Sequence, residues 1–283
     1  MLRNKQFRPQ LPVWIAAFLA IFGSSIAQKP GSIHPAPDTT GFALLVQQAN
    51  SRIFDQPDSA IFFATSLLEK AGNHPRAIVP IIQSKMIIAR AHYVLSNYSA
   101  SLEYSEEVMK LSQEYQYQPG MVYGLRNRGL IYLSQEKIAE ALDELKKSET
   151  LSRKIRDSIS LAAIYFNIGI CYESETDMDK AKSYFTRSRD IGIRIKDWHL
   201  YLMAQNRLAE SYYNTQEYEK AIKGFSEVLQ FSLYSDNWEK SYAYSGLGRT
   251  YLALKQYTTA IQNGLTSLSV SSGMKAGWDM HRA

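Results

Sequence analysis

From about Gly41 onward, hydrophobic and polar positions alternate with the period of an α-helix. In residues 161–173 apolar and small side chains recur every three or four positions, and after a short polar turn residues 180–191 repeat that spacing. Such spacing places the apolar side chains on one helix face, so the two stretches predict a helical hairpin. All nine prolines lie at or before Pro119, which leaves the rest of the chain without the strongest helix breaker.

The hairpin pattern repeats with a period of about 40 residues. Each unit has a small residue, an aromatic ring three positions later and another small residue nine positions after the ring. Four units carry the complete pattern: Gly129, Tyr132, Ala141; Gly169, Tyr172, Ala181; Ala209, Tyr212, Ala221; and Gly248, Tyr251, Ala260. A degraded copy begins at Ala89, and a further step back reaches Ala49. Because one hairpin buries only part of its apolar surface, a run of such units predicts stacked neighbours that share one core.

These residues give the chain a family resemblance. Three copies are the clearest: Leu208-Ala209-x-x-Tyr212 with Tyr218-x-x-Ala221-x-x-x-Phe225, Leu247-Gly248-x-x-Tyr251 with Tyr257-x-x-Ala260, and Ile168-Gly169-x-x-Tyr172 with Ala181-x-x-x-Phe185. With them the chain resembles tetratricopeptide repeat proteins. The resemblance spans roughly residues 41–272 and implies an all-α fold, a right-handed α-solenoid of five to six stacked helix-turn-helix repeats.

Two departures from the family pattern affect what the resemblance implies. The period of about 40 exceeds the usual 34, so longer helices or longer loops are expected. Gly264 replaces the aromatic residue expected in the second helix of the last complete unit, which weakens the packing expected there.

The resemblance also implies a ligand-binding surface, since in this family the first helix of each pair lines a groove. Transferred residue by residue, the groove candidates are Arg126, Asn127, Phe166, Asn167, Asn206, Arg207, Tyr213, Tyr242 and Arg249. Arginine and asparagine on successive helices can hold the backbone and carboxylate groups of a peptide. The same residues can also be solvated polar faces or hydrogen bonds between repeats, and the sequence leaves both interpretations open.

The first 27 residues have the pattern of a secretory signal peptide. Three positive charges precede the apolar stretch from Leu11 to Phe22, and Ser25-Ile26-Ala27 supplies small residues for cleavage before Gln28. An uncleaved membrane anchor is the alternative, but the stretch is shorter than the roughly 20 residues needed to span a bilayer. Residues 28–40 contain three prolines and predict an extended linker. The chain is therefore expected to be exported to the periplasm or cell envelope.

Charge and composition argue against several functions. Without the three positive charges of the first ten residues, 29 basic residues face 27 acidic ones, so no basic footprint for nucleic acid remains. The single cysteine, Cys171, lies among apolar residues of a predicted helix and fits a buried packing position. The five histidines lack the spacing of a helical zinc site, and no phosphate-binding loop is present. The sequence therefore predicts no catalytic residue, no metal site and no cofactor.

The last residues, 273–283, read as the start of an incomplete further repeat. Exported repeats of this period resemble the sensor region of bacterial membrane regulators such as histidine kinases. The expected function is a non-catalytic scaffold that binds a protein or peptide outside the cytoplasm, as the sensory portion of a signalling protein. A membrane contact is expected only through an uncleaved signal or a missing C-terminal region. The alternative is a free-standing envelope module that binds carbohydrate or another small ligand, with Trp238 or Trp278 as a stacking platform.

Overall fold

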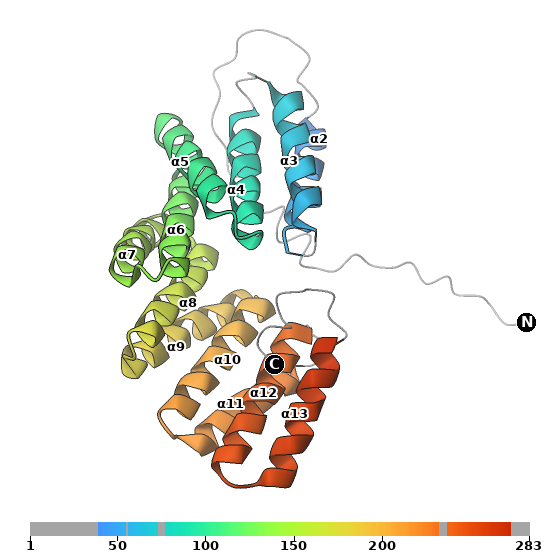
Figure 1. Ribbon diagram of the computed structural model, residues 1–283. Helices are drawn as coiled ribbons and strands as arrows, with labels where there is room; N and C mark the ends of the chain where they lie inside the picture. Colours follow the sequence, from blue (N-terminus) through green and yellow to red (C-terminus); the bar gives the residue numbers. More distant parts are fainter. Residues whose placement is uncertain (1–38, 55, 73–76, 232–236, 273–283) are drawn as a thin grey trace, which may run out of the picture. The chain divides into compact units, whose positions relative to one another are not determined.

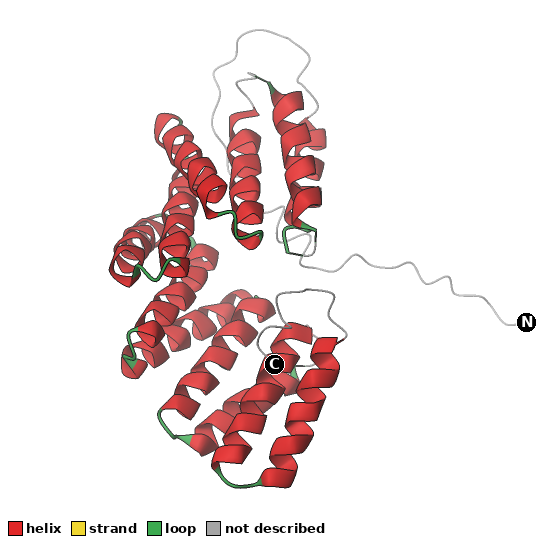
Figure 2. Ribbon diagram, in the orientation of Figure 1, coloured by secondary structure: helices red, strands yellow, loops and turns green. Residues whose placement is uncertain are grey.

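The computed structural model describes residues 39–272, apart from residue 55 and residues 73–76 and 232–236. Within these residues the chain forms helices and connecting loops and no strand (Figures 1 and 2). The helices are α2 (Thr39–Asn50), α3 (Pro57–Ala71), α4 (Ile78–Val94), α5 (Tyr98–Glu114), α6 (Gln118–Ser134), α7 (Ile138–Lys154), α8 (Ser158–Ser174), α9 (Met178–Ile195), α10 (Trp198–Asn214), α11 (Tyr218–Gln230), α12 (Asn237–Ala253) and α13 (Tyr257–Ser272). The predicted signal peptide, nearly all of the linker and the incomplete last repeat lie outside the described residues.

Consecutive helices pack against one another in pairs along the chain (Figure 1). Helices α2 and α3 form the first described hairpin and α12 and α13 the last, and from α4 onward each even-numbered helix is the first of its pair. The first helices of successive pairs also contact each other, from α2 and α4 through to α10 and α12. The predicted all-α fold of stacked helical hairpins is therefore confirmed. No helix in the described part of the chain is both long and apolar enough to cross a membrane.

The turns between helices share one backbone geometry. A residue with positive φ recurs about every 20 positions and lies one or two positions after the last residue of a helix: Ser96, Gln116, Glu136, Arg156, Thr176, Lys196, Gln216 and Lys255. In the turn at Ser96 the amide of Asn97 donates to the carbonyl of His92 at 2.8 Å and that of Ser96 to Tyr93 at 2.9 Å. These two bonds form a Schellman motif, which satisfies the last carbonyls of the helix.

The residue after each of these positive-φ positions directly precedes the first residue of the next helix. Asn97, Asp157, Asp177 and Asp197 each accept a hydrogen bond from the amide three residues later, so they are N-caps. Most helices from α4 to α12 have 17 residues and most connections have three. The 40-residue period therefore comes from long helices with tight turns, which decides between the two explanations that the sequence allowed.

The small residues of the repeat lie where the two helices of a pair cross. A Cβ atom added to Gly169 would come within 2.5 Å of the Phe185 ring, and one added to Gly129 within 2.8 Å of Leu145. Ala209 occupies the same position in α10 and is buried against Gly224 of α11. Full burial of Phe185 contributes roughly 2–3 kcal/mol.

The other members of the repeat signature are core residues in most pairs. Those without exposed surface are Ala141, Ala181, Ala221 and Phe225, whereas Tyr132, Tyr212 and Tyr251 are partly buried beside them. A methyl group added to Gly248 would lie 3.3 Å from the carbonyl oxygen of Ala260, because no ring separates the two helices there. Although α13 contacts α12 closely, it is the most exposed of the described helices, with one buried residue, Ser267.

Candidate functional site

Four of the predicted groove residues come together on the first helices of the last described pairs. They belong to a cluster, here called the three-helix charge cluster, that comprises Glu173 of α8, Arg207, Glu210 and Tyr213 of α10, and Tyr242 and Arg249 of α12. Each helix is supplied by a different repeat. The cluster therefore exists only because the repeats stack in register.

A two-pronged ion pair joins α10 and α12. Nη1 of Arg249 donates to Oε1 of Glu210 at 2.7 Å, and Nη2 donates to Oε2 at 2.5 Å. The same guanidinium lies 5.1 Å from the centre of the Tyr213 ring. Nη1 and Nη2 of Arg249 thus both donate to a side chain of the protein itself. Such bidentate pairs hold the two side chains in a fixed geometry.

Arg207 joins the cluster to α8. Its Nη1 donates to the hydroxyl of Tyr242 at 3.1 Å and lies 3.5 Å from the carboxylate of Glu173. Burial raises the pKa of Glu173, although Arg207 counteracts this shift. Burial also raises the pKa of Tyr242 to about 12, so its phenol is protonated at neutral pH. The Nε atom of Arg207 is buried and has no hydrogen-bond partner in the part of the chain that the structure describes.

Arg126 of α6 lies in a different environment, in which no described acidic side chain comes within ion-pair distance of it. Its guanidinium stacks over the Tyr123 ring at 5.8 Å, and that of Arg90 of α4 lies over Phe54 at 4.9 Å. Burial lowers the pKa of Arg126 to about 10, repulsion from Arg90 adds to the effect, and attraction from Asp157 offsets it only in part. The Nε atom of Arg126 is also buried without a hydrogen-bond partner among the described residues. We call these two arginines the Arg90–Arg126 pair.

The three predicted asparagines are inside the fold and unavailable to a ligand in this conformation. The Nδ2 atom of Asn127 donates to the hydroxyls of Ser101 and Ser105 at 2.9 and 2.8 Å, and these bonds tie α6 to α5. Asn206 donates to the Glu239 carboxylate at 2.7 Å, and Asn167 is 8% exposed. For Asn127 and Asn206 the interpretation as hydrogen bonds between repeats fits the geometry, because their partners lie on helices of neighbouring repeats.

Phe166, the remaining candidate, is half-buried and packs against Phe185 with ring centres 5.8 Å apart. It therefore contributes mainly to the core.

Sequence reasoning did not single out Arg90, Glu173 or Glu210. Arg90 and Glu210 directly follow the small residue of the repeat signature, as Arg249 does. Aligning that one position across the repeats would have found them. Glu173 follows the signature ring of its repeat, as Tyr213 does in the next repeat.

The described residues offer little for catalysis. Cys171 has no exposed surface, and burial raises the pKa of its thiol to about 12, so it is a poor nucleophile at neutral pH. No group of three histidine, cysteine or acidic side chains within the described ranges is arranged to hold a metal ion.

Stacked helical hairpins with side-chain clusters across their first helices define a helical repeat protein. The model of the tetratricopeptide repeat family matches residues 120–194 and 200–271, together more than half of the chain. The chain therefore belongs to the tetratricopeptide repeat family. No curated protein matches it in sequence.

Several solved structures share the fold at low sequence identity. BtubC (BKLC) from P. vanneervenii is 12% identical, with a TM-score of 0.63 over 83% of this chain and 94% of that one. Aspartyl phosphate phosphatase F from Bacillus subtilis is 16% identical, with a TM-score of 0.64 over 85% of this chain and 62% of its own length. NprR in complex with its cognate peptide NprX is 18% identical, with a TM-score of 0.59 over 83% of this chain and 68% of that one. These likenesses show the fold alone.

Proposed function

We propose that this protein is a non-catalytic scaffold that binds a protein or peptide partner on its first-helix surface. That surface comprises the Arg90–Arg126 pair and the three-helix charge cluster. It carries cations and aromatic rings from successive repeats, which suits an extended partner that crosses several helices. One structural neighbour is a phosphatase, so the fold alone does not exclude catalysis. The proposal therefore depends on the side chains of the first-helix surface and not on the fold.

The observation that carries the proposal is the uncompensated charge of the Arg90–Arg126 pair. Holding a guanidinium in a partly buried position without an acidic partner among the described residues costs free energy, and a second cation nearby adds to that cost. A carboxylate from a partner would remove both penalties at once. We therefore place an acidic side chain or the C-terminal carboxylate of the partner at these two arginines.

The three-helix charge cluster has a different part in this proposal. Its two arginines and two glutamates neutralise one another, so it adds no net attraction. It holds the rings of Tyr213 and Tyr242 at the surface, where both are partly exposed. Aromatic rings held in place by neighbours give contact area at low entropic cost. The cluster would thus favour a partner whose apolar segment lies next to the carboxylate that binds the Arg90–Arg126 pair.

The structural neighbour NprR was solved with a peptide, and that likeness makes a peptide a reasonable first partner to test for this chain as well. We further propose export, on the evidence of the three charges, the apolar stretch and the small residues before Gln28. An exported binding array of this kind would suit the sensory part of a bacterial signalling protein. Fractionation of producing cells and N-terminal sequencing test this step: a mature protein that begins at Gln28 supports it, and an intact first segment in the cytoplasm contradicts it.

The binding proposal is tested by capturing partners from envelope extracts and then measuring affinity for the captured peptide. Arg90→Gln and Arg126→Gln should each weaken binding by about tenfold, since a charged hydrogen bond is worth roughly 1.5–3 kcal/mol. Lys110→Gln on the exposed side of α5 is the matched control and should leave affinity unchanged. Equal affinity of the parent chain and all three variants would contradict the proposal.

A carbohydrate partner is the competing function, and one observation favours it. Trp238 stacks on Tyr242 with ring centres 5.4 Å apart and planes 28° apart, which offers a flat aromatic face. Thermal-shift screening separates the two proposals: stabilisation by a glycan and by no peptide would support the carbohydrate module. In that case Trp238→Ala should abolish the shift while Arg126→Gln preserves it. Trp278 lies outside the described residues.

A further inference from the structure

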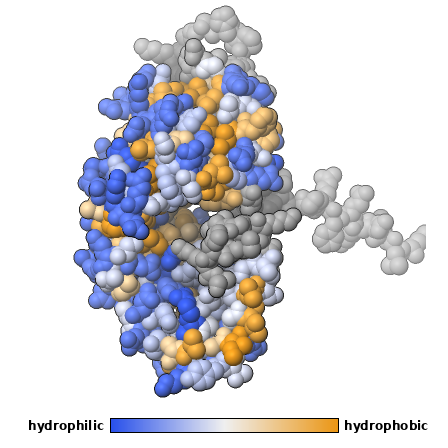
Figure 3. All heavy atoms as spheres, viewed as in Figure 1, coloured by the Kyte–Doolittle hydropathy of each residue, from blue (hydrophilic) through white to orange (hydrophobic). Residues whose placement is uncertain are grey.

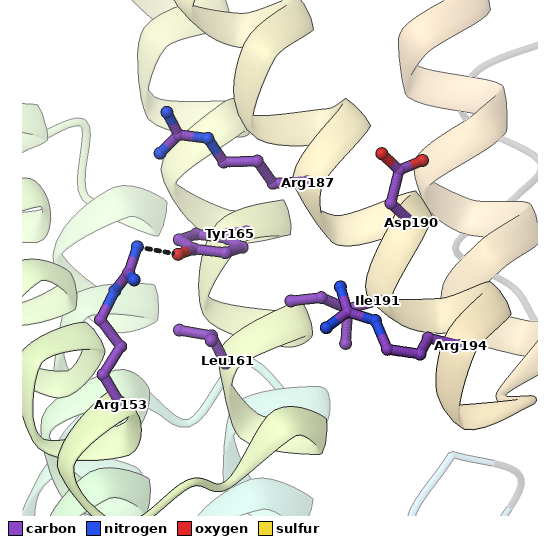
Figure 4. Close-up of a pocket in the computed structure, with 7 residues that line it drawn as sticks. All are labelled: Arg153, Leu161, Tyr165, Arg187, Asp190, Ile191 and Arg194. Carbon is purple, nitrogen blue, oxygen red and sulfur yellow. Dashed lines mark hydrogen bonds between the residues drawn. The ribbon is translucent and has the colours of Figure 1, made fainter.

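A pocket separate from the first-helix surface lies between α7, α8 and α9 (Figure 4). It has a volume of about 300 Å³, and its lining residues are Arg153, Leu161, Tyr165, Arg187, Asp190, Ile191 and Arg194. None of these residues belongs to the Arg90–Arg126 pair or to the three-helix charge cluster. The pocket therefore requires its own explanation.

Two of the three arginines have no acidic partner among the described residues. Arg153 donates from Nε to Glu149 at 3.0 Å and also to the hydroxyl of Tyr165. Arg187 contacts only aromatic rings, lying 5.0 Å from the centre of Tyr184. Arg194 forms no ion pair or hydrogen bond with any described side chain.

The acidic residue of the pocket does not neutralise them. The carboxylate of Asp190 accepts two hydrogen bonds from Arg189, at 3.0 and 2.7 Å, and in Figure 4 it points away from Arg194. Arg187 and Arg194, both exposed side chains, thus flank an open pocket without a counter-charge from the described part of the protein.

The rest of the lining is apolar or aromatic. Ile191 is 6% exposed and Tyr165 is 4% exposed, and together with Leu161 they form the wall between the arginines (Figure 4). Burial raises the pKa of Tyr165, so its hydroxyl is protonated at neutral pH. A ligand in this pocket would meet apolar surface and two guanidinium groups at the same time. Guanidinium groups bind planar and tetrahedral oxyanions through paired N–H donors.

We propose that this pocket binds the oxyanion group, phosphate or carboxylate, of a small ligand that also carries an apolar or aromatic part. Arg187 and Arg194 hold the anionic group, and Leu161, Tyr165 and Ile191 pack against the apolar part. Arg153 is held by Glu149 and Tyr165 and serves to position the Tyr165 ring. This site is independent of the partner surface proposed above.

The test uses the full chain and three probes of similar size in calorimetric titrations. Phenyl phosphate and benzoate carry the oxyanion on an aromatic ring, and benzamide is the neutral equivalent. We expect at least one anion to bind about tenfold or more tightly than benzamide, and the tighter of the two identifies the preferred oxyanion. The anion's affinity should also fall as salt rises. Equal binding of benzamide would overturn the proposal.

A pair of matched double variants locates the site. Arg187→Gln with Arg194→Gln should lower the anion's affinity by about tenfold or more, since two charged contacts are lost. Lys154→Gln with Arg156→Gln removes the same charge from exposed positions that do not line the pocket, and should change affinity by less than about twofold. Equal losses in both variants would show a general charge effect and reject the site. The first variant should still bind the peptide partner, so this test and that of the first-helix surface fail separately.

Discussion

Two arginines of α6, two positions apart, have opposite relations to their surroundings. Arg126 is partly buried beside Arg90 without a described acid in ion-pair contact, whereas Arg128 donates from Nε to Oε2 of Glu144 at 2.9 Å. The Glu144 side chain is 8% exposed, so this ion pair is largely shielded from water. The same substitution at the two positions should therefore have opposite effects on stability.

Arg126→Met should raise the free energy of unfolding by about 1 kcal/mol, because methionine fills the space without a buried charge. Arg128→Met should lower it by about 1–2 kcal/mol, because the buried Glu144 carboxylate loses its two bonds from Arg128 and keeps only the ion pair with the exposed Lys147, at 3.1 Å. Urea denaturation of the two variants measures both changes. Destabilisation by both would mean that Arg126 has a stabilising partner and would remove the basis of the proposed carboxylate site.

Two glycines on different helices should also respond in opposite ways to an added methyl group. A methyl group on Gly264 would meet nothing within 4 Å, whereas one on Gly169 would lie 2.5 Å from the Phe185 ring. Gly264→Ala should stabilise the protein by roughly 0.5–1 kcal/mol through helix propensity alone. Gly169→Ala should destabilise it by about 1–3 kcal/mol through overpacking. Thermal unfolding followed by circular dichroism tests the pair, and a loss of stability in Gly264→Ala would show that α13 packs more tightly than its exposure indicates.

How far the sequence predicts the structure differs with the kind of residue. The packing position of small residues such as Gly169 was predictable from the sequence, because few other residue types fit where two helices cross closely. The asparagines Asn127 and Asn206 were not, because a polar residue on a helix gives the same sequence signal whether it meets a ligand or a buried serine or glutamate. The pocket between α7, α8 and α9 gave no signal, since its arginines come from two helices and are distant in sequence.

At the level of the helices, the turn is the unit that sets the spacing of the repeats. Most of the described connections use one residue with positive φ, and from Ser96 onward none of these described residues is glycine. Side chains in this conformation cost roughly 1–2 kcal/mol, most for β-branched residues. The period was visible in the sequence, but the turn geometry was not, because the usual glycine marker is missing.

Thr176 is the β-branched member of this set, with φ of 61°. Thr176→Gly should raise the free energy of unfolding by about 0.5–1 kcal/mol, because the relief of strain exceeds the entropy gained by the unfolded chain. Thr150→Gly within α7 is the control and should lower stability by roughly 0.5–1 kcal/mol. Chemical denaturation of both variants measures the difference. A destabilised Thr176→Gly would mean that the threonine side chain makes a contact that outweighs the strain.

Across the molecule, apolar side chains are exposed mainly at the two described ends of the array. Leu44 and Phe62 are exposed in the first hairpin, and Ile261, Leu265 and Leu268 are exposed in α13. The stripe over α13 is visible in Figure 3. In inner repeats the corresponding positions meet the next hairpin: Ile222 of α11, equivalent to Ile261, packs against the core shared with α12. A terminal repeat therefore contributes less stability than an inner one.

The difference in burial between terminal and inner repeats can be tested by making the same substitution at two equivalent positions, Ile261 and Ile222. Ile261→Lys should change the free energy of unfolding by less than about 0.5 kcal/mol, because the side chain is already 63% exposed. Ile222→Lys should cost about 1–3 kcal/mol, because it places a charge at the junction of α11 and α12. Urea denaturation at several protein concentrations measures both. A large, concentration-dependent loss in Ile261→Lys would show instead that the α13 face is covered by another molecule in solution. An equal loss at every concentration would mean that the chain itself covers that face, and the described array would then continue beyond α13.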